Sequence, residues 1–471
     1  MIGRAAVAPI RTSRRTAMAG LAMVALALVI GACCAGGPRV AAIALAVVAG
    51  IALVIAIQRH PEVGVIAAVA AMPFAQHPWW ELNITASDMI VVLTFLAWLL
   101  TRAAWQRQSV RVTPGLCLYG LFVLAAGVSL LFPFNPREGL PNLIELVFFA
   151  LLYLLILNTI DTPGKVWLVI GGWLLGTSIA ATYGLYHYIL GTATTEFLAL
   201  NARRIVGTHM DPNFFGSLLA TSVMLCLALW WRARRPSARL VVTAGLALLG
   251  TVLVLTLSRG AIVGAAAGIL ALLVMSPRRL RLALALGCAI MVALAVRLPD
   301  YKSEHSVWSM RERLEHAAMR GDPNRMNRLY GIYIAAVLFS KHPLVGSGLE
   351  TYRDRMTPFS SRFSLRPAHS CHTVPALVLA ETGAIGFLLL NAFVLVVLIR
   401  VIRLARASPH AEVGILARHI AVALVVLLVV GLSIDVLYSR FFWIAFAVAD
   451  SLVLAHERSA REREPTEEDG Q

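Results

Sequence analysis

The chain has 471 residues, of which 59% are hydrophobic and 14% are charged, and its mean hydropathy is +0.77. Soluble globular domains carry many more charged residues and fewer apolar ones, so this composition excludes a soluble protein and indicates a polytopic membrane protein. The formal net charge of +16 does not indicate nucleic-acid binding, because the basic residues form no patch or stripe that would follow a phosphate backbone.

Apolar runs follow one another along most of the chain, and about fourteen of them predict membrane helices. Most of these runs are long enough to cross a membrane. In chain order these runs cover 17–36, 40–57, 63–75, 88–101, 115–132, 140–160, 166–190, 214–231, 240–257, 260–275, 282–298, 373–399, 414–434 and 437–455. The third and fourth runs flank "MPFAQHPWW" and are short, so one of them could be re-entrant, or their ends could extend through Trp79 and Trp80 at the interface. The predicted fold is an all-α, polytopic transmembrane helical bundle with about 12–14 spans.

Basic residues alternate between the connections. "RTSRR", "RAAWQRQSVR", "WRARRPSAR", "SPRRLR" and "RVIRLAR" lie in every second connection, and the short connections between them carry few basic residues. By the positive-inside rule, both termini are predicted to be cytoplasmic. The domain organisation is then one multi-span domain over 1–456, a long extracytoplasmic loop over 299–371 within it, and a charged cytoplasmic tail over 457–471.

The long loop has helical patterns of its own. "SVWSMRERLEHAAMR" places apolar residues on one helical face, as in a helix that lies on a membrane surface or on the bundle. Further along, Asp322 is a predicted N-cap with Pro323 at the first helical position, and the helix should end before Pro343. Gly346 and Gly348 then predict a turn rather than a phosphate-binding loop. The six cysteines show neither a disulfide framework nor metal-ligand spacing, so no metal site is predicted.

Charged and ionisable residues gather in the connections predicted to face outward. Arg203 and Arg204 lie in one such connection, Arg259 lies in a tight turn between two runs, and His369 and His372 lie at the start of the run over 373–399. Each has a structural alternative, because an arginine can snorkel to lipid phosphate and a histidine is often only an interfacial residue. Together they are better explained by one polar cavity, where guanidinium groups could hold a diphosphate through paired hydrogen bonds.

Other polar and small residues in these runs have structural interpretations. The Asp211–Asn213 turn is predicted to cap the following helix, and the spacing of Gly260, Gly264 and Gly268 predicts close helix packing. Glu381 lies within the run over 373–399 and has no basic partner one turn away, so its role stays open.

The motifs themselves, in this order, resemble those of the O-antigen ligase and O-antigen polymerase superfamily of bacterial membrane glycosyltransferases, from about residue 140 to the last span. "RIVGTHMDPNFFG" is similar to the family's Arg-x-x-Gly with a following Pro-Asn, and "TLSRGA" to its Ser-Arg-Gly. "KHPLVGSGLETY" is similar to His-Pro-x-x-Gly-x-Gly, and "HTVPALVLAETGAIG" to a His-Asn pair followed by Glu-x-Gly. Thr373 stands where the family usually has Asn, which leaves the orientation of the histidine open and makes His369 a competitor for its role.

The resemblance implies a GT-C-like enzyme that transfers or polymerises a glycan at the outer face of the bacterial cytoplasmic membrane, in O-antigen or exopolysaccharide assembly. The implied donor is an undecaprenyl-diphosphate-linked oligosaccharide and the acceptor a glycan or lipid hydroxyl, among membrane lipids and without a metal or other cofactor. By position, Arg204 and Arg259 would hold the diphosphate and His372 would be the catalytic residue. Arg203, Arg328, His369 and Glu381 are the supporting candidates.

Elementary chemistry agrees with these roles. Displacing a diphosphate from a sugar carbon needs stabilisation of the leaving group, which arginine supplies, and a base for the incoming hydroxyl, which histidine supplies. A polysaccharide transporter or lipid-linked glycan flippase is the alternative. It would predict inverted repeats and ionisable residues at mid-membrane, whereas this sequence has no visible repeat and gathers its charges at one face.

Overall fold

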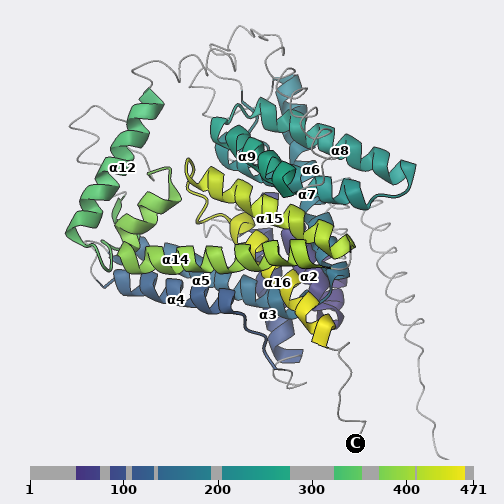
Figure 1. Ribbon diagram of the computed structural model, residues 1–471, viewed down its shortest axis with the longest axis horizontal. Helices are drawn as coiled ribbons and strands as arrows, with labels where there is room; N and C mark the ends of the chain where they lie inside the picture. Colours follow the sequence, from purple (N-terminus) through teal and green to yellow (C-terminus); the bar gives the residue numbers. More distant parts are fainter. Residues whose placement is uncertain are drawn as a thin grey trace, which may run out of the picture.

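The computed structural model describes residues 49–74, 85–101, 109–131, 136–191, 204–209, 211–275, 323–352, 371–408 and 411–461. This part of the chain is helical and contains no strand, which confirms an all-α bundle (Figure 1). The helices are α2 (Pro61–Ala71), α3 (Ala86–Trp98), α4 (Pro114–Ser129), α5 (Pro136–Thr159), α6 (Pro163–Leu190), α7 (Pro212–Arg232), α8 (Pro236–Leu255), α9 (Arg259–Met275), α12 (Pro323–Lys341), α14 (Val374–Ala407), α15 (Ala411–Gly431) and α16 (Arg440–Arg461), with a further helix over Ala49–Arg59 and the 3₁₀ helix η1 (Met72–Phe74) after α2.

Many of these helices have the composition of membrane spans. Within the described ranges, six are long and apolar enough to cross a membrane: 138–159, 163–190, 212–232, 236–255, 374–407 and 412–431. Shorter apolar helices cover 49–59, 61–74, 86–101, 114–129 and 259–275, so the protein is a multi-pass membrane protein. The runs at 17–36 and 282–298 lie outside the described residues, as does "SVWSMRERLEHAAMR", and the total of about 12–14 spans stays a prediction.

Several helices begin with the same local signal, a capping side chain followed by proline. Thr113, Thr162 and Asp211 accept hydrogen bonds from the backbone N–H groups of Leu116 (3.2 Å), Lys165 (3.3 Å) and Asn213 (2.5 Å). Such a cap satisfies an N–H that the first turn leaves unpaired, and the proline lacks one that would need a partner. The predicted capping role of Asp211 is therefore confirmed. Helix α12 likewise begins at Pro323 and ends at Lys341, as predicted, although Asp322 lies outside the described residues.

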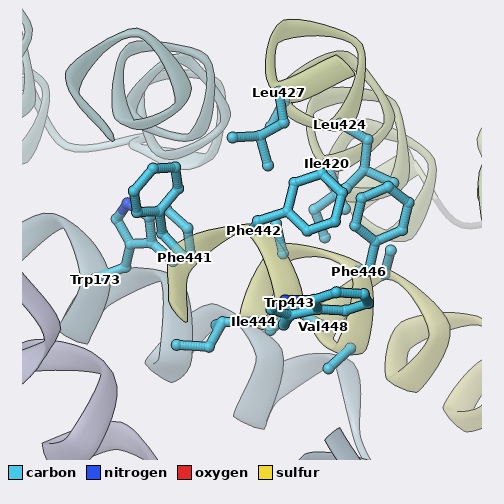
Figure 2. Packing of buried hydrophobic residues seen from close by; sticks show 14 of the residues in the cluster. Trp173, Ile420, Leu424, Leu427, Phe441, Phe442, Trp443, Ile444, Phe446 and Val448 are labelled. Carbon is cyan, nitrogen blue, oxygen red and sulfur yellow. The ribbon is translucent and has the colours of Figure 1, made fainter. Parts of the chain in front are cut away.

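The core of the bundle forms around α16, which is apolar on nearly every side. Figure 2 shows Phe442 and Phe446 of this helix on the side that faces Ile420 and Leu424 of α15. On another side, the Trp443 ring stacks on Tyr119 of α4 with 4.0 Å between ring centroids. Helix α16 therefore joins helices that are distant in the sequence, and it continues through Arg461, past the start predicted for the charged tail.

Small residues let α9 approach α15 closely. A Cβ atom at Gly264 would lie 2.6 Å from the Val430 side chain, and one at Gly268 would lie 2.5 Å from the Val426 side chain. At Gly260 the nearest atom would be Oγ of Ser433, at 2.3 Å. The glycine spacing is thus used for helix packing, as predicted, and it holds the first turn of α9 against the segment that leads into α16.

Candidate functional site

Arg204 is fixed at the junction of α7, α8 and α9. Its Nε donates to the backbone oxygen of Thr256, over 2.7 Å, and an Nη atom donates to Oδ1 of Asn213, over 2.8 Å. Asn213 lies in the first turn of α7, and Thr256 is the first residue after α8. Two helix ends therefore fix the orientation of the guanidinium, whereas a flexible surface arginine has no fixed orientation.

Arg259 starts α9 directly after the turn to which Arg204 binds. That turn is tight: Leu257 has a left-handed backbone with φ of 52°, and Ser258 is buried and caps α9 by accepting from the N–H of Ala261 at 3.4 Å. Because Thr256 and Arg259 belong to the same turn, Arg204 and Arg259 are held at one place in the fold. The first two motifs therefore meet at this turn, whereas a polar cavity shared with the histidines stays a prediction.

The other two motifs also form one unit, in which the loop after α12 fills a break in α14. Gly383 has φ of 67° and interrupts the helix, so Ala380 and Glu381 lose their helical partners Ala384 and Ile385. The loop replaces every lost bond. Its Ser347 and Gly348 N–H groups donate to the oxygens of Ala380 and Glu381 at 2.9 and 3.0 Å, and the N–H groups of Ala384 and Ile385 donate to Pro343 and Leu344 at 2.8 and 3.1 Å.

Glycine is required at this junction for two reasons. Gly346 has φ of 76°, and a Cβ atom there would lie 2.3 Å from the backbone of Glu381. The predicted turn at Gly346 and Gly348 is confirmed, and it packs against α14.

We expect Gly346→Ala to destabilise the protein by about 1–3 kcal/mol or more, because it combines an unfavourable backbone with a backbone clash. Thermal unfolding of the purified protein in detergent measures the change. Gly171→Ala is the matched control, since a Cβ atom at Gly171 meets nothing within 4 Å. Equal unfolding midpoints for the two variants would contradict this description of the junction.

Glu381 belongs to the same junction. Its side chain is 3% exposed, and the backbone N–H groups of Glu350 and Tyr352 donate to its carboxyl group. The carboxyl therefore caps the short turn that follows Gly348, and this contact gives a structural role to a residue whose role the sequence left open.

His372 precedes the Thr373 N-cap of α14 and lies at the edge of this junction. Its neighbour Cys371 is buried against α12, and His372 itself is exposed with a left-handed backbone, φ 55°. Two charged groups from other elements lie close enough to influence its pKa. They are Arg328 of α12 and Asp211, the N-cap of α7. Because Asp211 is two residues from Asn213, which binds Arg204, the histidine lies on the same side of the bundle as the arginine turn.

Left-handed backbone at residues other than glycine marks three of the four motifs. Within the described residues, Leu257, Glu350 and His372 have φ of 52°, 60° and 55°. Such conformations are rare outside glycine and cost free energy, and they concentrate at functional sites where the surrounding structure enforces them. Their distribution supports a single candidate site formed by these motifs.

Although His372 is exposed, the neighbouring chain removes part of its hydration, and this lowers its pKa from the ordinary value near 6.5; the positive charge of Arg328 lowers it further, while Asp211 opposes the shift. The imidazole is therefore neutral at pH 7. A neutral imidazole is the form that accepts a proton from a hydroxyl group.

This arrangement predicts opposite effects of two substitutions on the pH dependence of the reaction. Arg328→Gln removes a positive neighbour, raises the pKa of His372 and should move the acidic limb of the pH–rate curve to higher pH. Asp211→Asn keeps a good N-cap, lowers that pKa and should move the limb to lower pH. Initial rates of glycan transfer measured across pH test both. A limb that neither substitution moves would show that His372 does not control it.

The structure places most, but not all, of the predicted site residues. Arg204, Arg259, Arg328, His372 and Glu381 lie in the described part, whereas Arg203 and His369 lie outside it. Two further residues were not predicted as parts of a site: Asn213, read only as part of a capping turn, and Asp435. Within the described residues, no group of three or more His, Cys, Asp or Glu side chains could hold a metal ion.

Asp435 lies in the segment between α15 and α16, next to Ser433 and Ile434, which pack on Gly260. Burial raises its pKa to about 7, opposed by a hydrogen bond from the N–H of Leu437 and reinforced by the charge of Glu350. Glu350 in turn accepts a 2.8 Å hydrogen bond from Nδ2 of Asn142 in α5. Glu350 lies within the third motif, but no motif contains Asp435 or Asn142, and their proximity to Glu350 appears only once α5, the segment after α15 and the loop after α12 are brought together.

Comparison with known proteins provides an independent line of evidence. No curated protein matches the chain. A family model described as O-antigen ligase matches residues 244–391, a segment that runs from α8 into α14 and contains Arg259, the loop after α12, His372 and Glu381. This match covers less than a third of the chain, and it supports the resemblance of the motifs to those of the O-antigen ligase and polymerase family.

Proposed function

We propose that this multi-pass membrane protein transfers or polymerises a glycan from an undecaprenyl diphosphate carrier onto an acceptor hydroxyl at the outer face of the bacterial cytoplasmic membrane. The match to the O-antigen ligase family model supports a role in glycan assembly. The carrier, the side of the membrane and independence from metal are parts of the proposal. The observation that carries it is the anchoring of Arg204 on the turn that presents Arg259, with His372 on the same side of the bundle.

The proposed step is a displacement at the anomeric carbon of the donor sugar. The bond from this carbon to the diphosphate oxygen breaks, and the electron pair leaves with the diphosphate. Arg204 and Arg259 stabilise that charge through directed N–H groups. The acceptor oxygen forms the new bond to the carbon, and its proton passes to Nδ1 or Nε2 of His372.

A deletion strain tests this function in the cell. We expect glycans linked to undecaprenyl diphosphate to accumulate when the gene is removed. Complete loss of surface polymer would indicate a ligase, and polymer shortened to one repeat would indicate a polymerase. Normal surface polymer with no accumulated carrier-linked glycan would contradict both.

The proposed orientation can be tested by cysteine labelling, and the structure determines which positions are suitable. Cys371 is 1% exposed and cannot report on orientation. Ser340 near the end of α12 and Ser237 in the first turn of α8 are both exposed. In intact spheroplasts, Ser340→Cys should react with an impermeant thiol reagent and Ser237→Cys only after lysis, with the parent protein as background control. The reverse pattern would place the site on the cytoplasmic side.

A further inference from the structure

The connection between α7 and α8 forms a second polar site, separated from the first by the length of α7. Residues 212–232 form this helix, so its two ends lie about 30 Å apart at 1.5 Å per residue. Both α7 and α8 are candidate membrane spans, and their connection therefore lies at a membrane surface.

A groove of about 690 Å³ lies at this connection. Its volume is within the range of about 300–1,000 Å³ found for small-molecule sites. Three arginines and one carboxylate line it, together with apolar side chains from α7 and α8: Arg232, Arg234, Arg235, Glu412, Leu229, Ala233, Ala238 and Val242. The combination of a positive rim and an apolar wall matches an amphipathic anion better than a free one.

The three arginines are not equivalent. Arg232 is held in place, because its Nε lies 3.4 Å from Oε1 of Glu412 and its guanidinium lies over the Trp167 ring at 4.9 Å. Arg234 and Arg235 are exposed, and neither forms an ion pair or hydrogen bond through its side chain with any other residue in the described ranges. Two guanidinium groups therefore face the groove with their donors uncommitted, while the third neutralises its one acidic neighbour.

The surface beside the groove is apolar, and no other part of the described chain covers it. Leu240 and Val241, one turn further along α8, are 72% and 71% exposed. Trp230 and Trp231 at the end of α7 lie at the same level, as aromatic residues do at membrane interfaces, and Arg239 lies over the Trp230 ring at 4.8 Å. An acyl chain could follow the exposed face of α8 below a headgroup in the groove.

We propose that this groove binds one anionic diacyl phospholipid, with its phosphate between Arg234 and Arg235 and an acyl chain along Leu240 and Val241. Charge complementarity determines the headgroup, since basic pockets between helices at a membrane surface bind anionic headgroups. The exposed apolar face determines that the ligand is a lipid and not inorganic phosphate. The site is distinct from the glycan-transfer site and is independent of the proposed function.

The test is native mass spectrometry of the purified full-length protein titrated with dioctanoyl phosphatidylglycerol. We expect Arg234→Gln/Arg235→Gln to weaken binding at least about tenfold, the equivalent of losing one or more charge-assisted contacts. Arg403→Gln/Arg406→Gln is the matched control, because these exposed arginines lie at the far end of α14, on the same side of the bundle and outside the groove. This control should bind like the wild type.

Ala238→Trp provides a second variant that keeps every charge but fills the groove, and it should also weaken binding. Equal losses in the two double variants would show general attraction to basic residues and overturn the proposal. Unchanged binding by Ala238→Trp would show that the lipid does not occupy the groove, and it would also overturn the proposal. Dioctanoyl phosphatidylcholine binding as tightly as phosphatidylglycerol would exclude headgroup recognition, and glycerol 3-phosphate binding as tightly would exclude the acyl contact.

Discussion

Replacing His372 with alanine should leave the protein folded, inserted in the membrane and able to bind its lipid-linked donor, but should lower the rate of glycan transfer roughly 10²–10⁴-fold. This loss is the usual effect of removing a positioned general base. The structure makes the substitution a clean one, because His372 is exposed and lies outside α14, so no core packing is lost. Initial rates with purified protein and donor, together with a donor-binding measurement, give both quantities.

His369→Ala is the control for this experiment and should cost much less activity. The family pattern places Glu-x-Gly nine residues after its histidine, and Glu381 stands at that spacing from His372. Two nearly active single variants, or a larger loss at His369 than at His372, would mean that the catalytic role has been given to the wrong histidine.

Arg259→Ala and Arg204→Ala should each lower the transfer rate by about 10²–10³-fold, the usual effect of removing one group that stabilises a developing anion. Lysine at either position should restore only part of the rate, because a single ammonium group cannot reproduce the forked geometry of guanidinium. At Arg204 the reason is visible: Nε and an Nη atom bind Thr256 and Asn213 at the same time.

Asn213→Asp provides a test of that anchoring without removal of either arginine. It places a carboxylate against the Arg204 guanidinium, and this charge would compete with the diphosphate, so donor affinity should fall. If Arg259→Lys retained full rate and stability, that residue would be explained better as an arginine that snorkels to lipid phosphate.

Much of the fold follows from local sequence signals. Asp211, followed by proline, caps its helix as predicted, and Thr113 and Thr162 carry the same signal of a capping side chain followed by proline. The apolar runs show where most helices lie because a membrane leaves backbone groups no other partners. These signals are short in range, so they can be read without knowing which helices are neighbours.

The parts that escape prediction depend on contacts between distant segments. The interruption of α14 at Gly383 is stable only because the loop over 343–348 supplies its missing hydrogen bonds, and a single glycine in an apolar run does not reveal that partner. Glu381 likewise acquires its role from backbone N–H groups of Glu350 and Tyr352, just after this loop. Asp435 becomes a neighbour of the site only through the packing of Gly260 on Ser433.

The most direct test of the central claim is the fate of the donor in proteoliposomes that contain purified protein, a glycan linked to undecaprenyl diphosphate, and an acceptor. Glycosylated acceptor and free undecaprenyl diphosphate should form in equal amounts, and both should fall together in Arg259→Ala and His372→Ala. Mass spectrometry of the extracted lipids measures the two products. Donor that crosses the bilayer with its glycan still attached, at equal rates in the wild type and both variants, would contradict glycan transfer and identify a flippase.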